Sequence, residues 1–556
     1  MNKRELQNFS VWAKENLETQ IKVSLNLLGI FSETNIKRAF IKGDVTVIEG
    51  ESRTYPKNFK GKRDSIVRLI KEEGFENTIE RFAYTWFNRL IALRFMEVHG
   101  YLDHGFKIFP DGGIIEPEIL SNLNFVKDEL SLDVDQYTKL KNEDKIEELY
   151  RYVLFKQCNH LSKILPMLFS DEYDYLELLL PSVLLTGETI ITKLVELNKE
   201  DFLNDIEVIG WLYQFYISVK KDEVFASKKK ITKDTLPAVT QLFTPDWIVK
   251  YMAENSIGRI WLESYPNSPL KDEMKYYVEE AEQTEEVKLK LEEIRYKNVN
   301  PEEIKIIEPA AGSGHILVYA FELLFKMYEE KGYLKNDIPS LILKNNLVGL
   351  DVDKRASQLA QFSLMMKARS IDRRFFNKDR IVIPKVLEIK DSKKLFELDY
   401  KNSLKELINN DWKNNENNLT DNDLKVIEYV VNTFEDAKVI GSLLKIKESN
   451  AYLIVGNKIN KLRKTTVGGV FTNEFVLYGL KRISELLRLA HFMSNKYDVM
   501  ITNPPYVGIS LFEDPIKKYA NQYYPNSKTD MFAMFMEIDL IKENGLLAMI
   551  NMHSWM

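Results

Sequence analysis

Apolar residues in the first 230 positions recur at intervals of three and four, which is the spacing of helices that bury one face or more. The clearest example is the segment 79–96, whose arginines we interpret as ion-paired or snorkelling groups on a buried helix rather than as phosphate ligands. A second helical region covers about 117–219 and ends in aromatic residues that fit a core stripe. The pattern predicts a mainly α-helical N-terminal region over residues 1–230.

The pattern changes near residue 303, where short β-branched runs begin to alternate with helical segments. This alternation is typical of a parallel, doubly wound α/β sheet. We therefore expect an α/β domain over residues 231–556, with an inserted segment at about 395–490 that begins with an exposed Asn- and Lys-rich stretch. The expected strands are Ile304–Ile307, Leu347–Leu350, Ile381–Ile383 leading into Val386–Ser392, Tyr497–Ile501 and Leu546–Met552. Helices are expected over Asp272–Lys297 and Asp530–Lys542.

Composition narrows the class of protein. The chain has 556 residues, 45% of them hydrophobic and 29% charged, as in an ordinary globular protein. Its single cysteine, Cys158, excludes an internal disulfide framework, and no apolar run is long enough to span a membrane, so we expect a cytoplasmic protein. The scattered histidines predict no metal site. A net charge of -6 means that any contact with nucleic acid must come from local basic patches.

A glycine turn follows the first expected strand of the sheet. Its glycines permit a ligand to approach the backbone where a Cβ would collide, and the acid before it suits a cationic amino-acid group better than a pyrophosphate. The turn lacks the third glycine of the dinucleotide-binding pattern. It reads Glu308-Pro309-Ala310-Ala311-Gly312-Ser313-Gly314. We expect a nucleoside-type cofactor with a cationic group at this turn.

Acids also end the next two expected strands. Asp351 follows the second strand, where a carboxylate can accept hydrogen bonds from ribose hydroxyls. Asp391 lies at the end of the third, where it could face an adenine ring. Upstream, Thr244 is a plausible helix N-cap and Pro245 suits the first helical position.

The run Asn503-Pro504-Pro505-Tyr506 directly follows an apolar strand. Prolines donate no backbone hydrogen bond, so Asn503 and Pro504 offer acceptor oxygens at a rigid strand end. Two acceptors suit an exocyclic amine with two N–H donors, and Tyr506 supplies a flat face on which a base can stack. A base in a duplex would have to be flipped out to reach such a pocket.

These motifs and their order resemble the γ-class amino-methyltransferases, which modify adenine N6 in DNA with S-adenosylmethionine. The match runs from about Pro237 to Met556. The N-terminal half is more narrowly similar to the PglX-type adenine-specific methyltransferases of the BREX phage-exclusion systems. The segments that carry this second likeness are Ala83–Glu97, Gln157–Asn159 and Gly210–Tyr216.

The resemblance implies a Rossmann-like S-adenosylmethionine-dependent sheet and direct transfer of the methyl group without a covalent enzyme intermediate. Asn503 and Pro504 would hold the target amine while Tyr506 stacks on the flipped adenine. Asp351 would bind the ribose and Asp391 the cofactor adenine. The remaining implied cofactor contacts are Thr244 with Pro245, Glu308, Pro309, Ala310, Gly312 and Gly314, and Asp530 at the start of a helix.

Other functions remain open at this point. The same motif could serve a glutamine amide in a protein or adenine in RNA, and other phage-defence subunits could be partners. A fused restriction enzyme is weakly suggested by Asp44, Glu49 and Glu51. A non-catalytic fragment that binds DNA or a partner is the third class.

The position of the reaction motif gives one more expectation. In the enzymes that this chain resembles, the last strands and a target-recognition domain follow the motif, whereas here only residues 507–556 do. We therefore expect a sheet that is incomplete at the C-terminus, no target-recognition domain, and poor DNA methylation by this chain alone.

Overall fold

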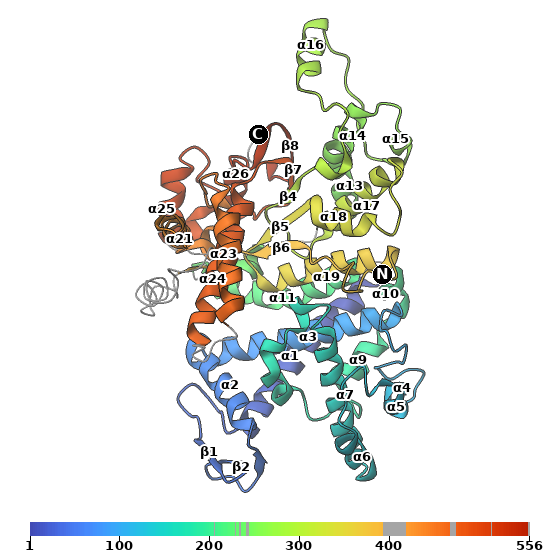
Figure 1. Cartoon of the computed structure of the whole chain (residues 1–556), viewed down its shortest axis with the longest axis vertical. Coiled ribbons are helices and arrows are strands. Elements are labelled where there is room, and N and C mark those ends of the chain that lie inside the picture. The colour runs from blue at the N-terminus through green and yellow to red at the C-terminus, as the bar shows by residue number, and fades with distance from the viewer. Residues whose placement is uncertain are drawn as a thin grey trace. The chain divides into compact units, whose positions relative to one another are not determined.

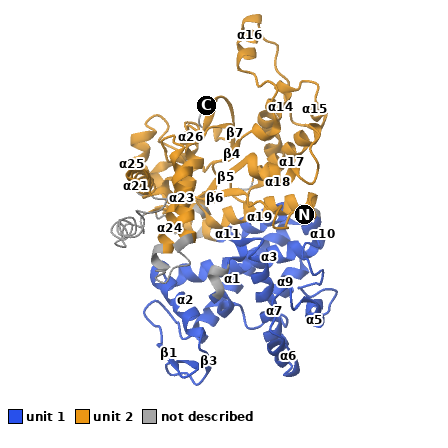
Figure 2. Cartoon of the chain, viewed as in Figure 1, with its two compact units in different colours: residues 1–219 blue, residues 220–556 orange. Residues whose placement is uncertain are grey.

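The computed structural model spans the whole chain, and its internal contacts divide it into two compact units, Met1–Val219 and Lys220–Met556, which Figure 2 colours separately. None of the described helices is long and apolar enough to cross a membrane. The structure describes residues 1–204, 206–227, 230–232, 235–240, 244–392, 419–466, 474–512 and 514–553. Most of the predicted Asn- and Lys-rich stretch and the end of the chain lie outside these residues.

The first unit is built mainly from helices. Helix α3 packs against α1 and α2, and a small antiparallel sheet of order β1-β2-β3 interrupts the helical pattern. Its elements are α1 (Lys3–Leu27), β1 (Ala39–Lys42), β2 (Val45–Ile48), β3 (Thr54–Pro56), α2 (Phe59–Glu73), α3 (Phe75–Val98), α4 (Glu118–Ser121), α5 (Leu123–Val126), α6 (Val134–Asn142), α7 (Ile146–Leu161), α8 (Pro166–Phe169), η1 (Asp171–Leu179), α9 (Ile190–Glu196), α10 (Lys199–Asn204) and α11 (Glu207–Ser227).

Helix α3 confirms the prediction of a buried helix whose arginines pair with other groups of the protein. Arg89 is 2% exposed, and its Nε donates to the Leu168 carbonyl at 3.0 Å. Arg94 forms an ion pair with Glu97 at 2.7 Å. Of the aromatic residues of α11, Tyr213 and Tyr216 lie in the core, where the rings of Phe87 and Tyr216 are 4.5 Å apart, whereas Trp211 and Phe215 are partly exposed.

Two further features of this unit bear on function. Asp44 is exposed in the turn between β1 and β2, and Glu51 forms an ion pair with Lys37 at 2.6 Å, so these acids are surface groups of a hairpin region. Cys158 is fully buried in α7, and burial raises the pKa of its thiol to about 11.

The second unit contains a five-stranded parallel sheet of order β6-β5-β4-β7-β8 (Figure 1). Its strands are β4 (Ile306–Glu308), β5 (Leu347–Asp351), β6 (Lys385–Glu388), β7 (Tyr497–Thr502) and β8 (Ile541–Met549). Every residue of β4, β5 and β7 is buried, which explains why they appear in the sequence as continuous apolar runs. The predicted α/β character and helical first part of the chain are thereby confirmed.

Helices cover both faces of this sheet (Figure 1). On one face Gly349 of β5 packs against Leu317 of α17, and on the other Val348 and Leu350 join a core cluster with residues of α21, α23 and α24. The helical elements of the unit are α12 (Leu236–Thr240), α13 (Asp246–Ala253), η2 (Glu254–Gly258), α14 (Arg259–Ser264), α15 (Leu270–Glu273), α16 (Glu285–Ile294), η3 (Pro301–Glu303), α17 (His315–Glu330), α18 (Ile338–Asn345), α19 (Lys354–Ile371), α21 (Asp421–Thr433), α22 (Ala437–Ile440), η5 (Gly441–Leu443), α23 (Ala451–Thr466), α24 (Glu474–Ser494), η6 (Ile509–Leu511), α25 (Asp514–Tyr523) and α26 (Met531–Phe535).

Several predicted element boundaries are wrong. The run Ile381–Ile383 is not a strand, because the strand hydrogen-bonded to β5 begins at Lys385. The expected helix over Asp272–Lys297 is two short helices, α15 and α16, separated by non-helical chain, and α16 buries none of its residues. The helix expected over Asp530–Lys542 ends at Phe535, and β8 begins earlier than expected, at Ile541.

Candidate active site

The two predicted motifs meet at the centre of the sheet. β4 pairs with β5 on one side and with β7 on the other, where Ile307 lies opposite Met500. The order of the strands reverses at this point, and doubly wound sheets bind ligands just outside the carboxyl ends of the strands there. The glycine turn leaves β4 and the Asn-Pro-Pro-Tyr turn leaves β7, so both lie at the same edge.

The backbone conformation of the glycine turn requires glycine. Gly314 has a φ of 85°, and a Cβ added to it would lie 2.7 Å from the Cβ of Ala360 on α19. Gly312 has a φ of 53°, but an added Cβ there would meet no atom within 4 Å. The Ala311 amide donates to the Leu350 carbonyl at 2.9 Å. The turn is therefore held against β5 while its tip at Gly312 faces open space.

Glu308 ends β4 and is only 2% exposed. Burial, with a further contribution from the nearby carboxylate of Asp351, raises the pKa of Glu308 well above its ordinary value. Its Oε2 atom is buried and has no hydrogen-bond partner among the described residues. A buried acid without a partner for one oxygen is costly, and a cationic group would supply that partner.

Asp351 holds the glycine turn. Its Oδ2 accepts from the Gly312 amide at 2.8 Å and its Oδ1 from the Asp353 amide at 2.7 Å. Burial raises the pKa of Asp351 to about 7, although these backbone amides oppose the shift. The predicted ribose-binding acid thus accepts one backbone amide from the glycine turn at Oδ2 and one from the start of α19 at Oδ1, and each oxygen keeps further acceptor capacity for hydroxyl donors.

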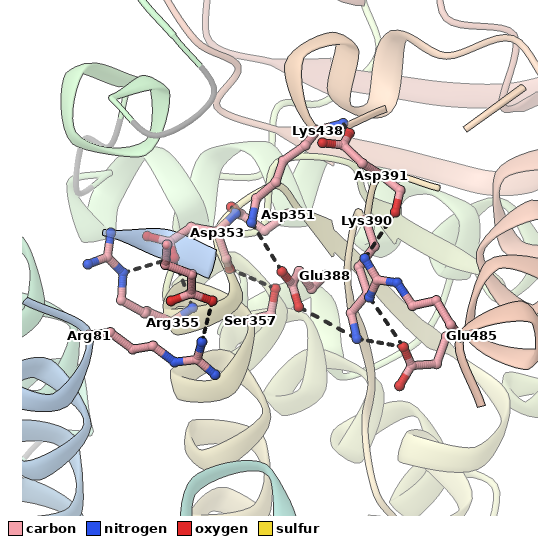
Figure 3. A network of polar contacts seen from close by, with 12 residues as sticks. Arg81, Asp351, Asp353, Arg355, Ser357, Glu388, Lys390, Asp391, Lys438 and Glu485 are labelled. Carbon is pink, nitrogen blue, oxygen red and sulfur yellow. Dashed lines mark hydrogen bonds and ion pairs between the residues drawn. The ribbon is translucent and has the colours of Figure 1, made fainter. Parts of the chain in front are cut away.

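Asp391 belongs to a polar network beyond β6 (Figure 3). Its Oδ1 accepts from the Lys438 amide at 2.7 Å, and the Lys438 Nζ lies 3.3 Å from Glu388, the register partner of Asp351. Burial acts to raise the pKa of Glu388, but Lys438 and Lys390 beside it outweigh burial and hold that pKa below its ordinary value. Glu388 is a partly buried charge next to the predicted site that the motifs did not indicate.

The chain from Phe434 to Leu443 packs against the carboxyl ends of β4 and β6. The Ser442 hydroxyl donates to the Pro309 carbonyl, and the Ser392 amide donates to the Phe434 carbonyl at 2.8 Å. Residues of this segment are also part of the core cluster on that face of the sheet. The described portion of the predicted insertion, from residue 419 on, is therefore a layer of the fold, and no sequence motif marked Lys438 or Ser442 as neighbours of the site.

Asn503 lies between two hydroxyl groups. Its Nδ2 donates to Thr244 Oγ1 at 3.0 Å, and its Oδ1 accepts from the Tyr506 hydroxyl at 2.5 Å. The Tyr506 hydroxyl also lies 3.0 Å from the Ile550 carbonyl beyond β8, and burial raises the pKa of Tyr506 to about 12. Of the two prolines that follow Asn503, Pro504 is buried and Pro505 half-buried.

Two sequence predictions about helix ends have different outcomes. Thr244 is not the N-cap of α13, because Pro245 takes that position and no side chain caps the helix. The proline ring fixes the backbone there, so the Thr244 hydroxyl is available to Asn503 instead. Asp530 is the N-cap of α26 and accepts from the Phe532 amide at 3.3 Å, while the ring of Phe532 lies 6.2 Å from that of Tyr506.

The predicted site residues thus fall into two groups at neighbouring strand ends. Thr244, Asn503 and Tyr506 are joined by hydrogen bonds at the end of β7, and Asp530 lies close to them through the bridge between its backbone and Gly508. The group at the ends of β4, β5 and β6 comprises Glu308, Pro309, Ala310, Gly312, Gly314, Asp351 and Asp391. A cofactor bound across the ends of β4, β5 and β6 would bring its reactive end towards the Asn-Pro-Pro-Tyr turn at the end of β7.

Comparison with known proteins agrees with this geometry. The α/β fold is consistent with a methyltransferase domain, and residues 345–556 match the Eco57I restriction-modification methylase family. The whole chain is related to adenine-specific methyltransferases: it is 37% identical over 582 residues to BrxX of Escherichia coli O9:H4 (strain HS) and 34% identical over 593 residues to PglX of Lacticaseibacillus casei (strain Zhang). The resemblance predicted from the motifs is confirmed.

The chain spans 47% of the length of each of these two relatives, and each match covers all of this chain. Among solved structures, a cryo-EM structure of a DrdV–DNA complex matches all of this chain and 36% of that chain, with 10% identity and a TM-score of 0.38. That score is too low for an inference about fold or function.

Proposed function

We propose that the chain carries the catalytic part of an adenine-specific DNA methyltransferase, which transfers a methyl group from S-adenosylmethionine to N6 of adenine. The observation that carries this proposal is the Asn503-to-Tyr506 turn at the end of β7, beside the glycine turn at the end of β4. The names of the relatives and the matched methylase family support the same activity. We assign the reaction to the second unit and interpret its sheet as a Rossmann-like methyltransferase sheet.

The residues at the ends of β4 and β5 fit this cofactor. When bound, S-adenosylmethionine supplies a methyl group activated on a cationic sulfonium. The buried Oε2 of Glu308, which has no partner among the described residues, would accept a hydrogen bond from the ammonium of the methionine part. The open space at Gly312 would admit the aliphatic chain of that methionine part. Asp351 would accept from the ribose hydroxyls, and Asp391 would face the adenine. Pro309, Ala310 and Gly314 would shape the backbone around it.

The residues after β7 would hold the base that is methylated. Asn503 Oδ1 and the Pro504 carbonyl would accept the two N–H groups of the adenine amine, so that the nitrogen lone pair points outward. The aromatic face of Tyr506 would stack on the base, an interaction worth about 1 to 3 kcal/mol in other nucleic-acid complexes. Catalysis would rest on this alignment, with the methyl group transferred directly and no covalent bond to the enzyme.

We propose double-stranded DNA with a flipped-out adenine as the substrate, and phage defence as the process that the modification serves. Other subunits of a defence system are possible partners in that process. The alternatives are adenine in RNA, a glutamine side chain, a fused restriction-modification enzyme and a non-catalytic fragment that binds DNA or a partner.

The decisive experiment offers the purified protein S-adenosylmethionine with a labelled methyl group and, in parallel, duplex DNA, RNA and protein substrates. The proposal expects label in N6-methyladenine from the duplex, at the low rate that the sequence predicts for this chain alone, identified by nucleoside mass spectrometry. Label in RNA or protein alone would favour one of those alternatives, and cofactor binding without transfer would favour the non-catalytic fragment. Sequencing of genomic DNA from cells with and without the gene would then locate the modified adenines.

A further inference from the structure

The carboxamide of Asn503 has two ends of opposite character. Its oxygen accepts hydrogen bonds, and its NH2 donates them. Only the oxygen can accept the N–H groups of a target amine. If the amide were rotated by 180° about its last bond, its own N–H donors would face the N–H donors of the amine. Something on the far side of the amide must therefore hold the NH2 end.

Thr244 is placed to do this. Its Oγ1 lies 3.0 Å from Asn503 Nδ2, which leaves Asn503 Oδ1 on the side of Tyr506. Thr244 is 5% exposed, and 259 positions of sequence separate it from Asn503. Asn503 is half-buried, so its NH2 is partly removed from water and gains from an acceptor, which the buried Thr244 hydroxyl supplies.

The backbone around Thr244 restricts where its hydroxyl can go. A residue that precedes proline is confined to extended conformations, and Pro245 is the N-cap from which α13 begins at Asp246. The hydroxyl does not cap that helix, since α13 has no side-chain cap bond. Its role must therefore be sought at Asn503.

We propose that Thr244 is a positioning residue for methyl transfer, which binds the NH2 end of Asn503 so that the carboxamide oxygen faces the target amine. This inference rests on the proposed function of the second unit. It differs from the role that the sequence resemblance implies for Thr244, which is contact with the methionine part of the cofactor. The two roles predict different effects of a substitution at Thr244. Loss of the positioning role lowers kcat, whereas loss of a cofactor contact weakens cofactor binding.

Thr244→Val is the test, because valine has nearly the same shape but cannot accept a hydrogen bond. We expect kcat for methyl transfer to adenine-containing duplex to fall roughly 10- to 100-fold, the range that corresponds to loss of one buried hydrogen bond. The Kd for S-adenosylmethionine should stay unchanged. Thr244→Ser keeps the hydroxyl and should restore most of the lost kcat.

Thr433→Val is the matched control, because the Thr433 hydroxyl donates to the Tyr429 carbonyl within α21 and lies outside the proposed site. It should transfer methyl groups like the unsubstituted protein. Three results would overturn the role of Thr244: full activity in Thr244→Val, a weakened cofactor Kd with unchanged kcat at saturation, or failure of Thr244→Ser to recover activity. Absence of transfer by the unsubstituted protein would instead reject the proposed function itself, so the two failures are distinct.

A misfolded variant would be recognised by its loss of affinity for S-adenosylmethionine. Thr244→Val that still binds S-adenosylmethionine with unchanged affinity has kept the sheet and the glycine turn. The side-chain NH2 resonances of Asn503, observed after labelling of asparagine with ¹⁵N, should shift in Thr244→Val and stay near their original position in Thr244→Ser. Unshifted Asn503 resonances in Thr244→Val would show that the hydrogen bond is absent in solution.

Discussion

The carboxamide of Asn503 is the side chain on which the proposed chemistry depends most. We expect Asn503→Ala to abolish methyl transfer, because it removes the acceptor of the target amine. S-adenosylmethionine binding, measured by calorimetry, should be unchanged, since the acids assigned to the cofactor lie at the ends of β4 and β5. Asn521→Ala, at an exposed position of α25, is the control. Transfer retained by Asn503→Ala would contradict the assignment.

Asp351 should govern how cofactor binding depends on pH. Its raised pKa of about 7 means that the carboxyl takes up a proton as the pH falls below neutrality. A cationic cofactor prefers the ionised form, so affinity should fall between about pH 8 and pH 6. Asp351→Asn should bind S-adenosylmethionine roughly 10- to 150-fold more weakly at pH 8, the scale of a hydrogen bond to a charged group. Equal affinities for both proteins in calorimetry would remove Asp351 from the site.

The same carboxyl should affect stability without cofactor. Because its pKa is higher in the folded protein than the ordinary 3.8, the folded state binds the proton more tightly than the unfolded state. The contribution of Asp351 to the free energy of unfolding is therefore largest below about pH 4 and declines as the pH rises to 7. We expect the urea midpoint of the unsubstituted protein to fall as the pH rises from 5 to 8 and that of Asp351→Asn, which carries no titrating group at this position, to fall less. Equal pH dependence of the two midpoints would contradict the raised pKa.

At the scale of residues, the site could be predicted only where the chemistry is local in sequence. The glycine turn and the Asn-Pro-Pro-Tyr run are contiguous, so their residue types and order carry the prediction. The hydrogen bond from Asn503 to Thr244 spans 259 positions, and that from Ser442 to Pro309 spans 133. Packing of distant elements creates such contacts, and no pattern in one sequence indicates them.

Among the elements, the turn between β4 and α17 can be tested with a pair of glycines. Gly314→Ala combines a positive φ with a clash against Ala360, whereas Gly332→Ala, with a φ of 81°, meets no atom within 4 Å. We expect Gly332→Ala to lower the free energy of unfolding by about 1 to 2 kcal/mol, the cost of a left-handed backbone. Gly314→Ala should cost more and also weaken cofactor binding. Equal losses for the two variants, measured in urea, would show that α19 does not restrict the turn.

The segment from Phe434 to Leu443 should stabilise the same turn from the other face of the sheet. Ser442→Ala leaves the buried Pro309 carbonyl without its donor, which should lower the free energy of unfolding by about 1 to 3 kcal/mol. Ser370→Ala, whose hydroxyl lies at an exposed position of α19, should change it by less than about 0.5 kcal/mol. Urea denaturation measures both, and equal effects would mean that the Ser442 contact contributes little.

Element types were predicted better than element ends. The fully buried strands β4, β5 and β7 follow from their apolar runs, whereas β6 was expected too early because Ile381–Ile383 is more apolar than the strand that actually pairs with β5. The Glu- and Lys-rich segment at 272–297 has the composition of a helix, but it makes too few apolar contacts to stabilise one long helix. The described helices between residue 419 and about 490 were predicted to be an insertion. Their packing against the sheet could not be predicted, because no motif in the sequence indicates it.

For the molecule as a whole, the proposal locates the cofactor within the second unit. Addition of S-adenosylmethionine should slow amide hydrogen exchange at the turns that follow β4, β5 and β6, because a ligand that binds only the folded state opposes local opening. Helices α1 and α3 of the first unit serve as the internal control and should exchange at the same rate with and without cofactor. Protection confined to the first unit would place the cofactor elsewhere.

The burial of Cys158 has a practical consequence for such experiments. A thiol whose pKa is raised to about 11 and whose side chain is inaccessible is a poor nucleophile for maleimide reagents at neutral pH. Since the chain has one cysteine, a second cysteine introduced at an exposed position would be the sole site of fast labelling. Fluorescent or spin labels could then report on movements of single loops in the native background, without prior removal of any residue.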